Sequence, residues 1–154
     1  MPDYFFDTSA FTKRYHPEPG SARIDELFED RLSSFRISNL AILETQSAFA
    51  MKVRTKVLDQ AAAEEAMDKV MNDLESRLVI AVGLRRNHMT NARLLVAKYG
   101  YLRRMRTLDA LQLSVALDLH RKRLVDVFVV ADKLPAEIAV LEGLTVENPE
   151  LKSD

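Results

Sequence analysis

The chain has 154 residues, of which 47% are hydrophobic and 29% charged, and its formal net charge is −1. This composition is typical of a globular protein, and the length suits one domain that buries a sizeable core. The sequence contains no cysteine, which excludes disulfides, thiolate zinc sites and cysteine nucleophiles. Any binding of nucleic acid would depend on a local basic patch, because the whole chain is almost neutral.

Short apolar runs rich in β-branched and aromatic residues alternate along the chain with longer helical patterns. Strands are predicted at residues 4–6, 35–38, 78–81, 127–131 and 145–147. Helices are predicted at residues 9–15, 22–31, 41–55, 61–75, 87–99, 107–119 and 134–142. This alternation predicts an α/β protein with three α/β/α layers and a central, mostly parallel sheet of four or five strands. Residues 1–149 are expected to form one domain, and residues 150–154 a polar tail.

The chain shows no signal for a membrane or for export. No apolar stretch approaches the roughly 18 residues that a membrane-spanning helix needs. The N-terminal segment contains Asp3 and Asp7 and lacks the basic flank of a signal peptide. Together with the absence of cysteine, these features favour a cytoplasmic protein that does not bind membranes.

Four acidic residues stand among apolar neighbours, where an unpaired charge is costly to bury. They are Asp7, Glu44, Asp109 and Asp132. Asp7 and Asp132 each end the apolar run of a predicted strand, and ligands of open α/β sheets bind at the carboxyl ends of the strands. A single acid in such a place is often a turn residue or a helix N-cap. Four of them, far apart in sequence, predict one acidic cluster that holds a divalent metal.

Asp109 has the strongest case of the four. At about 100° per residue, it lies on a helical stripe with Leu113. The opposite face is predicted to be exposed to solvent and contains Thr107, Ser114, Asp118 and Arg121. An acid on the apolar stripe needs a metal or a buried partner, and a salt bridge to one of the arginines that precede it is the alternative.

Glu44 is compatible with either a surface position or the site, because its helix is mixed in polarity. Two carboxylates about 4 Å apart repel each other by about 4 kcal/mol at an effective dielectric constant near 20. A cluster therefore needs protons or cations, and oxygen ligands favour Mg²⁺, with Mn²⁺ as an alternative. Ser9 follows Asp7 by two residues, and its hydroxyl is expected to reach the metal shell or a phosphate, to start the first helix, or both.

A metal held by carboxylates can hydrolyse phosphodiesters without a protein nucleophile. Basic residues near two of the acids are candidates for contacts with the phosphates of a nucleic-acid substrate. They are Lys13, Arg14, Arg103, Arg104 and Arg106. For each of them, a solvated helix end is the alternative interpretation.

Five short motifs, in this order and spacing, resemble the PIN-domain family, and specifically its VapC-type toxin ribonucleases from type II toxin–antitoxin systems. The motifs are FDTSA at 6–10, SNLAILE at 38–44, RTLDALQL at 106–113, VADK at 130–133 and GLTVENP at 143–149. The resemblance covers nearly the whole chain. It implies a PIN-like fold and a metal-dependent endoribonuclease that leaves a 5′ phosphate and a 3′ hydroxyl.

The resemblance also implies which residues act and which partners bind. Asp7, Glu44, Asp109 and Asp132 would be the catalytic and metal-binding acids, supported by Ser9. The implied partners are RNA, a second copy of the chain, and a small antitoxin whose C-terminal segment covers the active site. One position departs from the family pattern, which often has Ser or Thr where Val130 stands, so Asp132 is expected to be less essential than the other three.

Other classes of protein fit the sequence less well. A phosphatase of the haloacid dehalogenase type needs a second Asp where Ser9 stands, and nucleotide-binding folds need a glycine-rich loop that this sequence lacks. The main alternatives are a PIN-like module that binds RNA or protein without cleavage, and an RNA-processing nuclease with no toxin role. The presence of all four acids favours an active enzyme.

Overall fold

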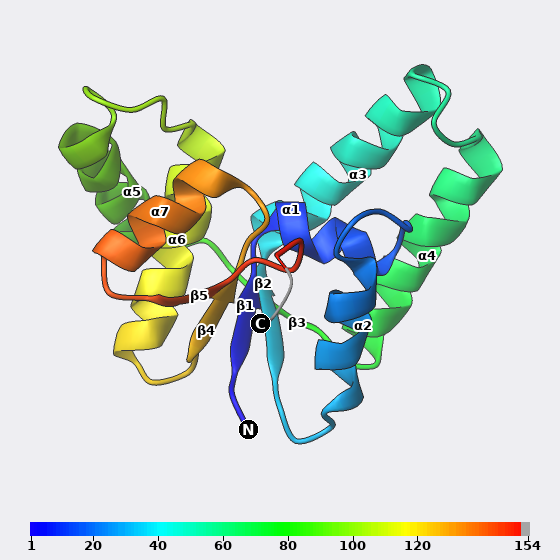
Figure 1. Ribbon diagram of the computed structural model, residues 1–154, viewed down its shortest axis with the longest axis horizontal. Helices are drawn as coiled ribbons and strands as arrows, with labels where there is room; N and C mark the ends of the chain where they lie inside the picture. Colours follow the sequence, from blue (N-terminus) through cyan, green and yellow to red (C-terminus); the bar gives the residue numbers. More distant parts are fainter. Residues whose placement is uncertain (152–154) are drawn as a thin grey trace.

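The computed structural model describes residues 1–151 and contains one five-stranded, entirely parallel sheet (Figure 1). The strands are β1 (Tyr4–Phe6), β2 (Phe35–Ser38), β3 (Ile80–Val82), β4 (Val127–Val129) and β5 (Thr145–Glu147). They lie in the order β3-β2-β1-β4-β5, and every neighbouring pair is parallel. The predicted α/β class and the parallel sheet are confirmed.

Helices cover both faces of the sheet and give the predicted three layers. One face carries α1 (Thr8–Phe11), the 3-10 turn η1 (Thr12–Arg14), α2 (Ser21–Glu29), α3 (Asn39–Arg54) and α4 (Gln60–Glu75). The other face carries α5 (Arg86–Tyr99), α6 (Thr107–Arg121) and α7 (Lys133–Leu141). Figure 1 shows the two groups of helices on opposite sides of β1, which lies at the centre of the sheet.

The sheet separates two hydrophobic cores, and β1 supplies aromatic side chains to both. Successive residues of a strand point to opposite faces, so Tyr4 and Phe6 enter the core beneath α1–α4, and Phe5 enters the core beneath α5–α7. Phe5 and Phe6 are fully buried. Burial of a side chain of this size contributes about 1.5–3 kcal/mol, so the apolar run before Asp7 anchors the strand that carries this acid.

The middle of the polar face of α6 is buried: the prediction that this face is exposed to solvent is correct for Thr107 and Arg121 and wrong for Ser114 and Asp118. Ser114 and Asp118 are both buried against α5. The Ser114 hydroxyl donates to the carbonyl of His88 at 2.8 Å, and His88 Nε2 lies 2.8 Å from Asp118 Oδ2. Burial alone would raise the pKa of Asp118, but hydrogen bonds from His88 and Lys122 outweigh it and lower the pKa. Helix α6 is therefore polar on this side because α5 supplies polar partners.

Several element boundaries differ from the prediction. The predicted first helix, 9–15, is split into α1 and η1, and β3 begins two residues later than expected. Strand β4 ends at Val129, after which the Val130 N–H donates to Glu147 at the end of β5 and the chain turns into α7. Of the predicted tail, 150–154, residues 152–154 lie outside the described part of the chain, and Glu150 pairs with Lys13. Within residues 1–151, no helix is both long and apolar enough to cross a membrane.

Candidate active site

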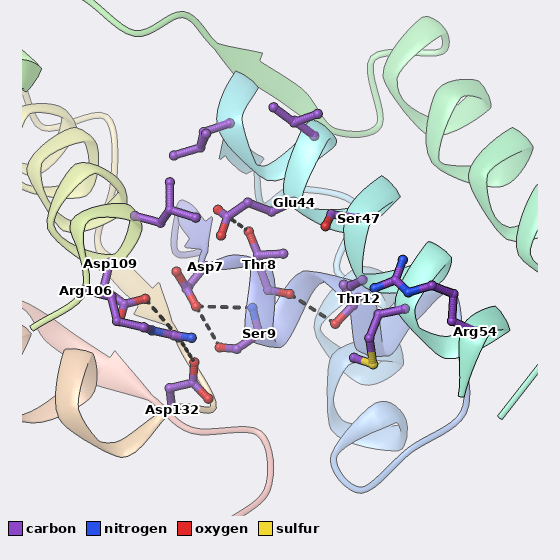
Figure 2. A pocket seen from close by; sticks show the side chains of 15 residues that line it. Asp7, Thr8, Ser9, Thr12, Glu44, Ser47, Arg54, Arg106, Asp109 and Asp132 are labelled. Atoms are coloured by element: carbon purple, nitrogen blue, oxygen red, sulfur yellow. Dashed lines mark hydrogen bonds and ion pairs between the residues drawn. The ribbon is translucent and has the colours of Figure 1, made fainter. Parts of the chain in front are cut away.

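The four predicted acids line one open cleft of about 730 Å³ at the carboxyl ends of β1 and β4. They come from four separate segments: the β1–α1 junction, α3, α6 and the start of α7. Figure 2 shows Asp7 at the centre, with Glu44 on one side of it and Asp109 and Asp132 on another. The parallel sheet thus gathers residues that are more than a hundred positions apart in the sequence.

Asp7 is the most deeply buried of these carboxylates, at 3% exposure. It caps the N-terminus of α1, where its Oδ2 accepts hydrogen bonds from the Ser9 backbone N–H at 3.1 Å and from the Ser9 hydroxyl at 2.7 Å. Its Oδ1 accepts no hydrogen bond from residues 1–151. Burial raises the pKa of Asp7 to about 7; the bonds from Ser9 oppose this rise, and the charges of Asp109 and Glu44 add to it.

Ser9 orients Asp7 and is itself held from behind. Its hydroxyl oxygen accepts a hydrogen bond from the Ala131 N–H at 3.0 Å, and the Ala131 carbonyl accepts one from the Asn148 side chain at 3.3 Å. The loop after β4 and the segment after β5 therefore fix the rotamer of Ser9. The hydroxyl proton points at the carboxylate, so Ser9 supports the acid and also begins α1.

Glu44 is half-buried in the second turn of α3 and is held through one of its two oxygens. Its Oε1 accepts hydrogen bonds from the Thr8 hydroxyl and from the Gln112 side-chain amide, both at 2.9 Å. Its Oε2 accepts none from the described residues. Sequence reasoning assigned no role to Thr8 or Gln112. The available signals were the place of Thr8 between Asp7 and Ser9, and the spacing of Gln112, three residues after an acid on the same helix.

Asp109 and Asp132 are joined by a single arginine. Arg106 Nε lies 3.0 Å from Asp109 Oδ2, and Arg106 Nη2 lies 3.3 Å from Asp132 Oδ2. The salt bridge considered as the alternative for Asp109 is therefore present. The Arg106 side chain is 65% exposed and that of Asp132 is 46% exposed, and an exposed ion pair of this kind contributes only about 0.2–1 kcal/mol. Asp109 is buried, so the guanidinium would leave it only when another cation takes its place.

Asp132 is partly exposed, with 46% of its side chain accessible. It stands at the N-cap position of α7, and its side chain makes no capping hydrogen bond. Partial burial raises its pKa, the negative charge of Asp109 adds to the rise, and Arg106 opposes it. Val130 is fully buried in the core beneath α5–α7. It occupies the position where the family that the sequence resembles often has Ser or Thr.

The oxygen donors of the cleft suit a hard divalent cation, although their side chains are too far apart to coordinate one ion together. Within residues 1–151, no three carboxylate or imidazole groups converge closely enough to hold an ion together. The cleft nevertheless offers only oxygen donors among its acids, and the Asp7 and Glu44 oxygens without hydrogen bonds remain available. Mg²⁺ and Mn²⁺ favour such ligands. These ions therefore stay a prediction, supported by donor chemistry rather than by ligand distances.

The predicted RNA-binding residues are placed differently from one another. Arg106 lines the cleft. Lys13 is 5% exposed, with its Nζ 3.1 Å from Glu18 and 2.9 Å from Glu150. Arg14 pairs with Asp73 at 3.0 Å and lies over the ring of Phe28. Arg103 pairs with Glu137 at 3.3 Å, and Arg104 is exposed. A role of these five residues in RNA binding stays a prediction.

The far end of the cleft contains features that the sequence did not single out. Arg54, at the end of α3, lines the cleft opposite Arg106 (Figure 2). The lining also includes exposed apolar side chains of α3, among them Leu43 and Met51, which are 67% and 45% exposed. The cleft therefore has an acidic centre, an arginine toward each end and exposed apolar side chains along one wall.

Together, the sheet order, the two helical layers and the acidic cleft at the carboxyl edge define a PIN-like α/β fold. The sequence matches no family model and no curated protein. Among solved structures, VapC20 from Mycobacterium tuberculosis, a sarcin–ricin loop cleaving toxin, is similar with a TM-score of 0.66 and 16% identity, over 97% of this chain and 99% of that one.

Two further solved structures are similar over almost the full length of both chains. A chain of VapBC2 from Rickettsia felis, solved with a DNA fragment from its promoter, has a TM-score of 0.62 and 15% identity, over 95% of this chain and 98% of that one. A chain of VapBC-1 from nontypeable Haemophilus influenzae has a TM-score of 0.60 and 13% identity, over 96% and 98%. The predicted resemblance to VapC-type toxins is thus confirmed at the level of the fold.

Proposed function

We propose that the chain is a metal-dependent endoribonuclease and the toxin of a toxin–antitoxin pair. The observation that carries the proposal is the environment of Asp7. Its carboxylate is buried, has one oxygen without a hydrogen bond, and faces a cleft lined by three more acids. A purely structural acid would be expected to have a cationic partner of its own. Titratable groups perturbed by burial and by like charges are typical of functional sites.

In this proposal, Asp7, Glu44 and Asp109 hold a divalent cation, and Asp132 completes or adjusts its shell. A bound Mg²⁺ would polarise the scissile phosphate and assist the attack of water. The protein itself contributes orientation: hydrogen bonds fix one oxygen of Asp7 and one of Glu44 and leave the other oxygen free. Because the cleft accommodates an anionic backbone only if cations offset its acids, metal and RNA are expected to bind together.

Arginines and apolar side chains would provide the substrate side. Arg106, once released from Asp109 and Asp132, would contact a phosphate next to the scissile bond, and Arg54 would contact one further along the strand. Arginine is well suited to this role because its planar guanidinium matches phosphate oxygens. Exposed Leu43 and Met51 would pack against bases or against a protein partner. The proposed partners are RNA, an antitoxin and a second copy of the chain. Of these, the antitoxin is supported by the VapBC structures among the similar proteins.

Incubation of the purified protein with total RNA tests the proposal. Cleavage is expected with Mg²⁺ or Mn²⁺ and is expected to stop when EDTA is added, because the carboxylates alone supply no Lewis acid. Mapping of the new ends should find 5′ phosphates and 3′ hydroxyls. Cleavage that persists in EDTA would contradict the metal-dependent mechanism.

Expression in cells provides the test of the toxin role. A toxin should arrest growth when it is produced alone, and co-expression of its antitoxin should restore growth. A protein that cleaves RNA in vitro but leaves growth unchanged in its native host would instead be an RNA-processing nuclease. A protein that binds RNA without cleaving it would be a binding module.

A further inference from the structure

A buried amide side chain lies directly behind the acidic cleft. Gln112 belongs to α6 and is 1% exposed. Its Oε1 accepts a hydrogen bond from the Ser38 hydroxyl at 3.0 Å, and its Nε2 donates to the Thr8 hydroxyl at 3.1 Å and to Glu44 Oε1 at 2.9 Å. This one side chain therefore connects the end of β2, the start of α1, the body of α3 and the body of α6.

The network leaves Gln112 and Thr8 with a single consistent arrangement of donors and acceptors. A glutamine amide has two N–H donors, and the two hydrogen bonds from Nε2 use both. The Thr8 hydroxyl has one proton, which it donates to Glu44 Oε1 at 2.9 Å while its oxygen accepts from Gln112. Two donors thus converge on Glu44 Oε1. They fix the orientation of the carboxylate and leave its other oxygen without a hydrogen bond from the described residues.

The arrangement around Glu44 repeats the one around Asp7. In each case, one carboxylate oxygen accepts two hydrogen bonds, and one of the two donors is a hydroxyl that is held from behind by an N–H group. The two hydroxyls belong to neighbouring residues, Thr8 and Ser9. The Ser9 hydroxyl next to Asp7 accepts its hydrogen bond from the backbone N–H of Ala131. The Thr8 hydroxyl next to Glu44 accepts its hydrogen bond from the side chain of Gln112.

We propose that Gln112 is a positioning residue, which sets the orientation of Glu44 for metal binding and contacts neither metal nor RNA. Its burial keeps it from the substrate, so its effect must pass through Glu44 and Thr8. The inference rests on the proposed metal-dependent function. Loss of a residue that orients a metal ligand typically weakens metal affinity or activity by about 10–100-fold.

The test measures the affinity of the metal-free protein for Mn²⁺. The concentration of free Mn²⁺ is read from its electron paramagnetic resonance signal. Gln112→Met keeps the volume and removes both donors, and it is expected to weaken Mn²⁺ binding by about 10–100-fold. Gln46→Met is the matched control, because Gln46 is an exposed residue of α3. This variant should bind Mn²⁺ with the same affinity as the wild type. RNA cleavage by Gln112→Met should fall by a similar factor at limiting metal.

A double-mutant cycle with Glu44→Gln separates positioning from a general loss of structure. If Gln112 acts through Glu44, then Gln112→Met should change Mn²⁺ affinity by less than about two-fold in the Glu44→Gln background, because interacting residues are non-additive. An equal loss in both backgrounds would overturn the inference. So would wild-type affinity in Gln112→Met.

A second pair of variants covers the case in which Gln112→Met does not fold. Thr8→Val removes the hydroxyl that Gln112 supports, whereas Thr8→Ser retains it. Weaker Mn²⁺ binding in Thr8→Val but not in Thr8→Ser supports the inference, and equal binding in the two overturns it. Absence of Mn²⁺ binding in the wild type would overturn the proposed function and this inference with it, whereas normal wild-type binding with unaffected variants overturns the inference alone.

Discussion

Replacement of Asp7 by asparagine is expected to reduce Mg²⁺-dependent RNA cleavage by about 10³-fold or more. The metal contributes several kcal/mol of charge stabilisation in the transition state, and each 1.36 kcal/mol corresponds to about a factor of ten in rate. Asparagine keeps an oxygen that can accept the Ser9 hydrogen bonds and cap α1. The variant should therefore fold, and the loss should come from the missing charge.

This prediction is tested by measuring the rate of cleavage of a defined RNA substrate at saturating Mg²⁺ for the wild type and for Asp7→Asn. Asp68→Asn is the matched control, because Asp68 is exposed on α4, far from the cleft. It removes the same charge and should leave the rate unchanged. Cleavage by Asp7→Asn at more than about a tenth of the wild-type rate would be incompatible with the several kcal/mol assigned to the metal.

The same substitution is expected to stabilise the metal-free protein at alkaline pH and to leave its stability nearly unchanged at about pH 4. The pKa of Asp7 is raised by burial from 3.8 to about 7. The folded state therefore binds this proton more tightly than the unfolded state does. The contribution of Asp7 to the free energy of unfolding therefore decreases as the pH rises from about 4 to about 7. Above that window, the folded protein carries the full cost of a buried charge at Asp7.

The size of the effect follows from the shift of about three pKa units. At about 1.4 kcal/mol per unit, the charged Asp7 lowers the free energy of unfolding by about 4 kcal/mol at about pH 8. Denaturant unfolding in EDTA at about pH 4 and about pH 8 measures it, with Asp68→Asn again as the control. A difference between wild type and Asp7→Asn that is the same at both pH values would show that the charge of Asp7 carries no such penalty.

Three of the strands and two of the acids, Asp7 and Asp132, could be predicted from local signals, whereas Glu44 depended mainly on the family resemblance. The bounds of β1, β2 and β5 were predicted correctly, since each contains aromatic or β-branched residues, which favour strands. Asp7 stood out because it ends a run of three aromatic residues that the sheet buries on both faces. The parallel topology then explains why acids from distant segments meet at one edge.

The hydrogen-bonded support of the site could not be read from local patterns. Gln112 looks like any polar residue on a helix, and its role depends on partners 74 and 104 residues away. The polar face of α6 misled the helical-wheel argument for a similar reason. Periodicity separates polar from apolar faces, but it cannot show that a second helix, with His88 at its buried end, covers the polar face.

The arginine next to Asp109 was also ambiguous from sequence alone. A metal and a salt bridge are alternative ways to balance a buried acid, and the motif that contains Arg106 supplies the means for both. The structure places Arg106 between Asp109 and Asp132. Because Asp109 is buried, the arginine would leave it only when a metal takes its place, so the arginine and a metal can use the same acids at different times.

Binding of Mn²⁺ to the metal-free protein is the most direct test of the claim that these acids form a metal site. The wild type at about pH 8, where Asp7 is ionised, should bind Mn²⁺ saturably, and Mg²⁺ should displace it. Asp7→Asn should bind at least about 10-fold more weakly, because a charged ligand is lost. Wild-type protein that shows no saturable binding, or an Asp7→Asn variant with unchanged affinity, would contradict the account.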